Sequence, residues 1–266
     1  MIKLAFQEGL IPGESLFAKL QWLAAHEIDG IELSGDQLPR RLPDIKALLA
    51  RFPVQVTAIC GGYRGWLVGE DPEEQRYFLE DMLTLLECAA ELGATGVIAP
   101  AIWGTSHYLP LPKRRSTPGQ DRDTLISHLR TLGEHAASRG TAMLLEPLNR
   151  YQAHYINRID EALEIIAAVS SPGVKLIADL FHMNIEETDP LTSLEQAGKQ
   201  LAYVHLSDSN RRLPGLGHID FAAVFATLHR MGFQGPASVE ALPPENAEQL
   251  TNCASFLEAM RNQGGE

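Results

Sequence analysis

The length, composition and charge of the chain are those of an ordinary globular protein. Its 266 residues suffice for one large domain, and with 45% hydrophobic and 21% charged residues it can bury a sizeable core. The formal net charge of -12 would repel phosphate backbones, because nucleic-acid-binding proteins gain affinity from clustered lysine and arginine. The basic clusters at 113–115 and 211–212 are short, so we expect no nucleic-acid partner.

The cysteines and the apolar stretches indicate a cellular compartment. Cys60, Cys88 and Cys253 are widely spaced and form no CxxC pair, which argues against a disulfide framework, a redox couple or a thiolate zinc site. The apolar stretch at residues 1–6 is too short for a signal peptide, and no stretch approaches the roughly 20 apolar residues of a membrane span. We therefore expect a cytoplasmic protein with no membrane partner.

Short apolar runs alternate along the chain with longer segments whose apolar residues repeat at helical spacing. The predicted strands are Lys3–Gln7, Gly30–Leu33, Gln55–Cys60, Gly96–Pro100, Ala142–Glu146, Lys175–Asp179, Ala202–Leu206 and Ala237–Glu240. The predicted helices are Ser15–Ala25, Pro43–Arg51, Pro72–Leu92, Asp121–Arg139, Arg158–Val169, Leu191–Gly198, Phe221–Met231 and Ala247–Met260. This alternation is typical of a parallel α/β fold, and we predict a single (β/α)₈ TIM barrel domain over residues 1–266.

Metal-capable side chains stand at or near the ends of four consecutive predicted strands. They are Glu146 on the fifth strand, Asp179 on the sixth, His205 on the seventh and Glu240 on the eighth. Their separations of 33, 26 and 35 residues each correspond to one strand and helix unit. Because the carboxyl ends of barrel strands meet at one mouth, where the active sites of such barrels lie, we expect these side chains to converge.

Three carboxylates and one imidazole brought together favour a cation between them. Without one, the like charges would raise one another's pKa and resist ionisation. This ligand set suits Mn²⁺ best, with Mg²⁺ or Co²⁺ as alternatives, whereas structural zinc prefers thiolates. Each residue alone has a plainer explanation as a helix N-cap, a salt-bridge partner or part of a buried polar network. Four in succession favour one divalent metal ion held by all four.

Three segments carry family motifs: EPLNRY at 146–151, DLFHMNIEE at 179–187 and HLSDSNRRLPGLGHIDF at 205–221. They resemble ketose 3-epimerases of the D-tagatose 3-epimerase type, within the xylose isomerase-like superfamily, and the resemblance in strand and helix order covers nearly the whole chain. It implies that the same four residues hold the metal and that His182 and Arg211 bind substrate oxygens. It also implies a small sugar substrate, no nucleotide cofactor, and a homodimer or homotetramer.

Two further positions are expected to contact the substrate. The family commonly has an acidic residue six positions beyond its first glutamate, whereas this chain has Gln152, so recognition of the substrate there is expected to differ. Trp103 opens the longest irregular segment, Trp103–Gly119, whose length is typical of a lid or a partner surface. Its aromatic face suits the apolar side of a sugar, and simple packing is the alternative.

Epimerisation of a ketose at C3, like aldose–ketose isomerisation, begins with removal of a proton next to a carbonyl. A metal can stabilise the resulting enediolate. Inversion needs one group to remove the proton and another to return one on the opposite face, and Glu146 and Glu240 are the candidate catalytic pair. Which of them acts first depends on the handedness of the substrate and stays open. We therefore expect a metal-dependent isomerase of carbohydrate metabolism.

Other functions share this scaffold and stay open as alternatives. Hydroxypyruvate isomerase and inosose isomerase or dehydratase use the same general metal chemistry. An apurinic-site endonuclease would take extra histidines from strands three and four, where this chain has Cys60-Gly61-Gly62 and Ala99-Pro100-Ala101. A barrel that merely binds a sugar would need no pair of carboxylates at a metal.

Overall fold

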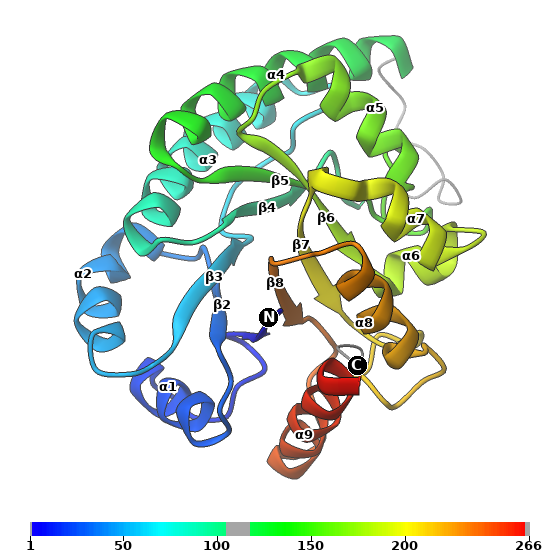
Figure 1. The fold of residues 1–266 in the computed structure, drawn as a ribbon. Helices are drawn as coiled ribbons and strands as arrows, with labels where there is room; N and C mark the ends of the chain where they lie inside the picture. Colours follow the sequence, from blue (N-terminus) through cyan, green and yellow to red (C-terminus); the bar gives the residue numbers. More distant parts are fainter. Residues whose placement is uncertain (1, 105–117, 264–266) are drawn as a thin grey trace.

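Eight parallel strands close into a barrel in the computed structural model, which describes residues 2–104 and 118–263 (Figure 1). The strands are β1 (Lys3–Gln7), β2 (Gly30–Ser34), β3 (Gln55–Cys60), β4 (Gly96–Pro100), β5 (Ala142–Glu146), β6 (Val174–Asp179), β7 (Leu201–Leu206) and β8 (Pro236–Val239). Each pairs in parallel with the next, and β8 pairs with β1 to complete the ring. The predicted (β/α)₈ barrel is therefore confirmed.

Helices surround the barrel on its outer side (Figure 1). Within the described residues they are α1 (Leu16–Ala25), α2 (Leu38–Leu49), α3 (Pro72–Leu92), α4 (Pro118–Arg139), α5 (Ile159–Val169), α6 (Leu180–Glu186), α7 (Pro190–Ala197), the 3₁₀ turn η1 (Gly198–Gln200), α8 (Phe221–Arg230) and α9 (Ala247–Gln263). The bounds of α3 match the prediction because both ends are capped. The Asp71 side chain accepts the N–H of Glu73, and Gly93 takes a φ of 66°.

The clearest differences from the predicted helices are at α2 and α6. α2 begins at Leu38 rather than Pro43, because Pro39 occupies its first turn. Pro43 then lies inside the helix, where it removes one hydrogen bond to the carbonyl of Pro39. α6 is absent from the prediction because its seven residues are too few for helical spacing to show. Asp179 both ends β6 and caps α6, so strand and helix follow each other without a loop.

The strand side chains divide between two apolar clusters. The larger one packs the strands against the helices, and the smaller one comprises Ala58, Ile98, Ala142, Leu144, Ile177 and Tyr203. Because successive strand residues point to opposite faces, we assign the smaller cluster to the interior of the barrel. There the hydroxyl groups of Thr57 and Tyr203 lie 2.7 Å apart. The barrel is thus a packed core that supports the side chains at its carboxyl end.

The predicted irregular segment Trp103–Gly119 is only partly covered. A lid or partner surface at 105–117 lies outside the described residues. α4 begins at Pro118 instead of the predicted Asp121. No helix in the described parts of the chain is both long and apolar enough to cross a membrane.

Candidate metal centre

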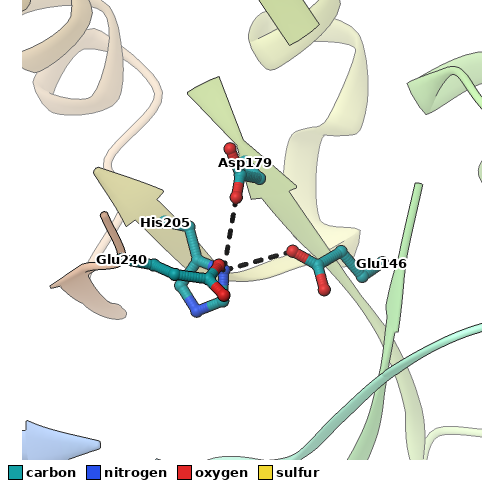
Figure 2. A group of neighbouring side chains, drawn as sticks. All are labelled: Glu146, Asp179, His205 and Glu240. Carbon is teal, nitrogen blue, oxygen red and sulfur yellow. Dashed lines mark hydrogen bonds and ion pairs between the residues drawn. The ribbon is translucent and has the colours of Figure 1, made fainter. Parts of the chain in front are cut away.

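The four residues predicted as metal ligands meet at the carboxyl end of the barrel (Figure 2). Glu146 and Asp179 end β5 and β6, His205 lies one residue before the end of β7, and Glu240 directly follows β8. The register pairs Asp179 with His205. One ligand atom from each residue lies within 4.8 Å of the other three. We call this group the carboxylate–imidazole cluster.

The Nδ1 atom of His205 is surrounded by the three carboxylates. It lies 2.6 Å from Oε2 of Glu240, 3.1 Å from Oε1 of Glu146 and 3.6 Å from Oδ2 of Asp179. In Figure 2, Glu146 approaches this nitrogen from the right and Asp179 from above, while the carboxylate of Glu240 overlaps the imidazole ring in this view. The ligand atoms therefore face one another across a small space, as the coordination of one ion requires.

Burial and charge shift the pKa of each carboxylate in the cluster. Burial raises the pKa of Glu146 to about 7, against the opposing effect of His205. Burial also opposes ionisation of Glu240, but His205 and Arg211 lower its pKa to about 2. For Asp179 the cost of burial is outweighed by Arg211, which holds its pKa well below the ordinary value. Glu146 is thus the carboxylate of the cluster that most readily carries a proton.

Glu32 in β2 contacts the opposite nitrogen of His205. It is fully buried, its Oε2 lies 3.0 Å from Nε2 of His205, and its Oε1 accepts the side-chain N–H of Gln7 at 2.8 Å. Burial would lower the pKa of His205, but Glu240 and Glu32 raise it well above its ordinary value. The ring therefore takes two protons unless a cation replaces the one on Nδ1. The pattern of metal-capable residues on four consecutive strands does not include Glu32 as a partner of His205. The sign of Glu32 in the sequence is a single charged residue inside the apolar run 30–33.

Arg211 brings a positive charge to the cluster, as its predicted role requires. Its Nη1 donates to Oδ2 of Asp179 at 2.5 Å, and its Nη2 lies 2.7 Å from Oε2 of Glu240. The guanidinium carbon lies 5.0 Å from the centre of the Phe181 ring. Burial would lower the pKa of Arg211, but Asp179 and Glu240 raise it. Arg211 therefore stays charged beside the carboxylates.

Asp208 holds the loop that carries Arg211. Its buried carboxylate accepts three backbone N–H groups, from Ser209, Gly215 and Ile219. A Cβ added at Gly217 would lie 2.1 Å from Oδ1 of Asp208, so the loop needs a glycine there. Arg211 itself has a φ of 60°, a left-handed conformation that costs a non-glycine residue about 1–3 kcal/mol. The loop around Asp208 thus imposes a conformation that Arg211 would not adopt alone.

His182 is the second predicted substrate-binding residue that reaches the cluster. It lies in α6, is buried, and places Nε2 at 3.9 Å from Oδ2 of Asp179. Its Nδ1 accepts the backbone N–H of Asn149 at 3.1 Å. Burial lowers the pKa of His182 despite the nearby charge of Asp179. The ring therefore reaches the cluster with one nitrogen and the loop after β5 with the other.

Gln152 and Trp103, also predicted to bind substrate, lie farther out on neighbouring loops. The backbone N–H of Gly104 donates to the Gln152 carbonyl at 2.8 Å, which ties the loop after β4 to the loop after β5. The Trp103 side chain is half exposed, and its ring lies 6.1 Å from that of Trp66. Among the described contacts, no hydrogen bond or ion pair joins either side chain to the carboxylate–imidazole cluster. Their contact with substrate stays a prediction.

The residues present fit a divalent cation. The ligand atoms of the cluster are three carboxylate oxygens and one imidazole nitrogen, a set that suits a hard or intermediate ion. With Glu32 included, four carboxylates surround one imidazole, and Arg211 supplies one permanent positive charge. A closed (β/α)₈ barrel with such a cluster at its carboxyl end is the arrangement typical of enzymes that work with a divalent cation.

Comparison with known proteins identifies the family. The model of the xylose isomerase-like TIM barrel matches residues 20–259. The chain therefore belongs to the xylose isomerase-like TIM barrel family.

Similar proteins within this family are sugar epimerases. The 3-dehydro-D-guloside 4-epimerase of Escherichia coli K12 is 36% identical over 237 residues, which are 88% of this chain and 90% of the relative. The crystal structure of 3-keto-D-glucoside 4-epimerase from E. coli has a TM-score of 0.92 at 32% identity and covers 97% of this chain and all of that one. The D-psicose 3-epimerase of Enterocloster bolteae is 31% identical over 177 residues, 65% of this chain and 57% of the relative. The predicted resemblance and the expected isomerase class are confirmed.

Proposed function

We propose that this protein is a metal-dependent epimerase that inverts the carbon next to the carbonyl of a keto sugar. The observation that carries the proposal is the convergence of the carboxylate–imidazole cluster on one point, with Arg211 and His182 at its edge. Removing a proton beside a carbonyl requires a base close to the carbon and positive charge close to the oxygens. The cluster and its two neighbours supply both.

Glu146, Asp179, His205 and Glu240 are the proposed ligands of the cation. When bound, the cation supplies Lewis-acid stabilisation of the negative charge that develops on the substrate oxygens. We propose Mn²⁺ as the ion, with Mg²⁺ and Co²⁺ as alternatives, because oxygen ligands with one imidazole suit these ions. Glu32 and Gln7 hold the imidazole in orientation from the opposite side.

Glu146 and Glu240 are the proposed proton-transferring pair. Their carboxylates both lie next to Nδ1 of His205, at 3.1 and 2.6 Å, and reach it from the ends of two different strands, β5 and β8 (Figure 2). A sugar held between them presents the two faces of its reacting carbon to different carboxylates. One can then remove the proton while the other returns a proton on the opposite face, which inverts the centre. Arg211 and His182 donate hydrogen bonds to the sugar oxygens and orient the ring.

Two substrate classes share this local chemistry: a 3-keto hexoside inverted at C4 and a free 2-ketose inverted at C3. In both, the reacting carbon carries a hydroxyl group and adjoins a carbonyl. We favour the 3-keto hexoside because the E. coli relative named for such a glycoside aligns with 88% of this chain, against 65% for the D-psicose relative. The neutral Gln152, where the resemblance to ketose 3-epimerases calls for an acid, points the same way.

Incubation with Mn²⁺ in D₂O tests the proposal directly. The panel contains 3-keto hexosides, free 2-ketoses, hydroxypyruvate and 2-keto-inositol, and NMR reads the deuterium position and the product configuration. We expect deuterium at C4 of a 3-keto hexoside together with inversion. Label at C3 of a ketose would support the second substrate class, and transfer between C1 and C2 would indicate an isomerase. Exchange with no member of the panel would refute the proposed function.

A further inference from the structure

The ring of His182 is held by Asn149, a residue outside the carboxylate–imidazole cluster. Asn149 lies in the loop between β5 and α5 and is buried, as is His182. Its backbone nitrogen lies 3.1 Å from Nδ1 of His182, and its side-chain Nδ2 lies 2.8 Å from the same atom. One ring nitrogen therefore faces two N–H groups of one neighbouring residue.

The direction of both hydrogen bonds follows from the neighbouring backbone. The peptide N–H of Asn149 can only donate, so Nδ1 of His182 must accept. The side-chain oxygen of Asn149 accepts the peptide N–H of Tyr151 at 3.0 Å, which leaves the amide NH₂ to face the ring. Since Nδ1 accepts, the neutral ring carries its proton on Nε2.

The packing around His182 fixes the orientation of the ring. A half turn would replace Nδ1 with a carbon and leave two buried N–H groups of Asn149 without an acceptor. The Phe181 ring packs edge-on against the imidazole, with centroids 5.3 Å apart. In the observed orientation Nε2 lies 3.9 Å from Oδ2 of Asp179, at the edge of the cluster.

We propose that Asn149 is a positioning residue that holds His182 in the tautomer protonated on Nε2, so that this ring donates a hydrogen bond to a substrate oxygen at the cluster. The inference rests on the proposed function for the identity of that oxygen. The side chains of the cluster are mainly carboxylates, which accept hydrogen bonds, so the donors at its edge are His182 and Arg211, which also pairs with Asp179 and Glu240. The Nε2–H of His182 thus supplies a donor to an oxygen that gains negative charge as the proton leaves carbon.

The tautomer can be read without any substrate, by ¹⁵N NMR of histidine-labelled protein, metal-free and loaded with diamagnetic Mg²⁺. We expect an unprotonated Nδ1 and a protonated Nε2 for His182, assigned by its loss in His182→Gln. Asn149→Asp keeps the size of the side chain but replaces its donor with a carboxylate oxygen, whose charge should outweigh the retained backbone N–H and draw a proton onto Nδ1. Asn149→Ala removes the side-chain donor but keeps the backbone N–H, so the original tautomer should persist.

Activity then separates positioning from packing. If Asn149 only filled space, truncation to alanine would be worse than the isosteric Asn149→Asp. The proposal predicts the reverse, with kcat/KM of Asn149→Asp about tenfold or more below that of Asn149→Ala. Asn157→Asp makes the same charge change in the same loop, at a residue whose side chain donates to the carbonyls of Leu148 and Ala153, and should leave the His182 tautomer unaltered.

Several outcomes would overturn the inference. One is a wild-type spectrum with the proton on Nδ1, and another is an Asn149→Asp spectrum that keeps it on Nε2. An equal tautomer change in Asn157→Asp would attribute the effect to general charge. Should Asn149→Asp fail to fold, the wild-type and Asn149→Ala spectra still decide the tautomer. Because these spectra need no substrate, failure of the proposed function leaves them interpretable, and a protein active on keto sugars with the opposite tautomer refutes only this inference.

Discussion

The two halves of the barrel contribute to the site in different ways. The carboxyl ends of β5 to β8 supply all four members of the carboxylate–imidazole cluster, and the segments that follow β5, β6 and β7 add Asn149, His182 of α6 and Arg211. From β1 to β4, the described contact with the cluster is the one between Glu32 and the far nitrogen of His205. The aromatic residues Trp66 and Trp103 stand on loops of this first half. The proposed catalytic groups are thus concentrated in the second half, while Glu32 of the first half contacts the imidazole from the opposite side.

We expect the largest loss of activity from a substitution in the second half of the barrel. Glu240→Gln removes one proposed ligand charge and one of the two proton-transferring groups, and we expect epimerisation to fall about 10²–10⁴-fold. Isothermal titration with Mn²⁺ should show weakened binding in the same variant. Glu245→Gln is the matched control, because Glu245 is exposed and pairs with Arg212 at the surface. Unchanged activity in Glu240→Gln would remove this residue from the catalytic pair.

A smaller effect is expected from the first half. Glu32→Gln removes the charge that faces Nε2 of His205 while keeping the shape of the side chain, and we expect Mn²⁺ affinity to fall about 10–100-fold. The measurement is calorimetric and needs no substrate. Glu8→Gln makes the same change beside β1, where Glu8 pairs with Arg41 instead of His205. Equal losses in both variants would contradict a specific role for Glu32.

The same contrast decides what could be predicted from the sequence. The four ligand candidates follow from apolar strands that each end in a metal-capable side chain at intervals of one strand and helix unit, so a repeated pattern identifies them. Glu32 has no such repetition around it. α6 is too short for a helical period to appear, and Asp179 serves as strand end, helix cap and proposed ligand together.

Other features depend on contacts that have no local signature. The pairing of Asn149 with His182 joins residues 33 positions apart, and only the fold brings them together. The predicted start of α2 was wrong because Pro39 and Pro43 each suit the first turn of a helix, and the local sequence does not distinguish between them. Local chemistry therefore predicts the barrel and the cluster, while orienting contacts require the tertiary structure.

His205 contacts Glu32 from the first half of the barrel and Glu240 from the second. Because both charges favour its protonated form, we predict that metal binding releases protons. Without metal, Glu240 and Glu32 hold the pKa of His205 well above its ordinary value, and burial raises that of Glu146 to about 7. A cation must displace the Nδ1 proton of His205 at neutral pH and, below about pH 7, the proton of Glu146 as well. Affinity should therefore rise with pH, about tenfold per unit for each proton displaced, and less steeply above about pH 7.

Titration calorimetry in buffers of different ionisation enthalpy measures this release. The expected count is about one proton above pH 7 and approaches two below it, as the linkage of metal binding to ligand deprotonation requires. In Glu32→Gln the release from His205 should decrease, because that ring loses one of the charges that keep it protonated. A release independent of pH in the wild-type protein would contradict the raised pKa of Glu146.

The smallest expected effect concerns the first half alone. Trp103 is 53% exposed and packs obliquely against Trp66, so its removal should leave the cluster intact. We expect Trp103→Ala to raise KM for a keto sugar about three- to tenfold with little change in kcat, because the substitution removes one aromatic contact with the substrate. Phe17→Ala is the control, since Phe17 is also partly exposed but packs on Phe52 at α1. A fall in kcat with unchanged KM would instead give the first half a part in the chemistry and break the division between the two halves.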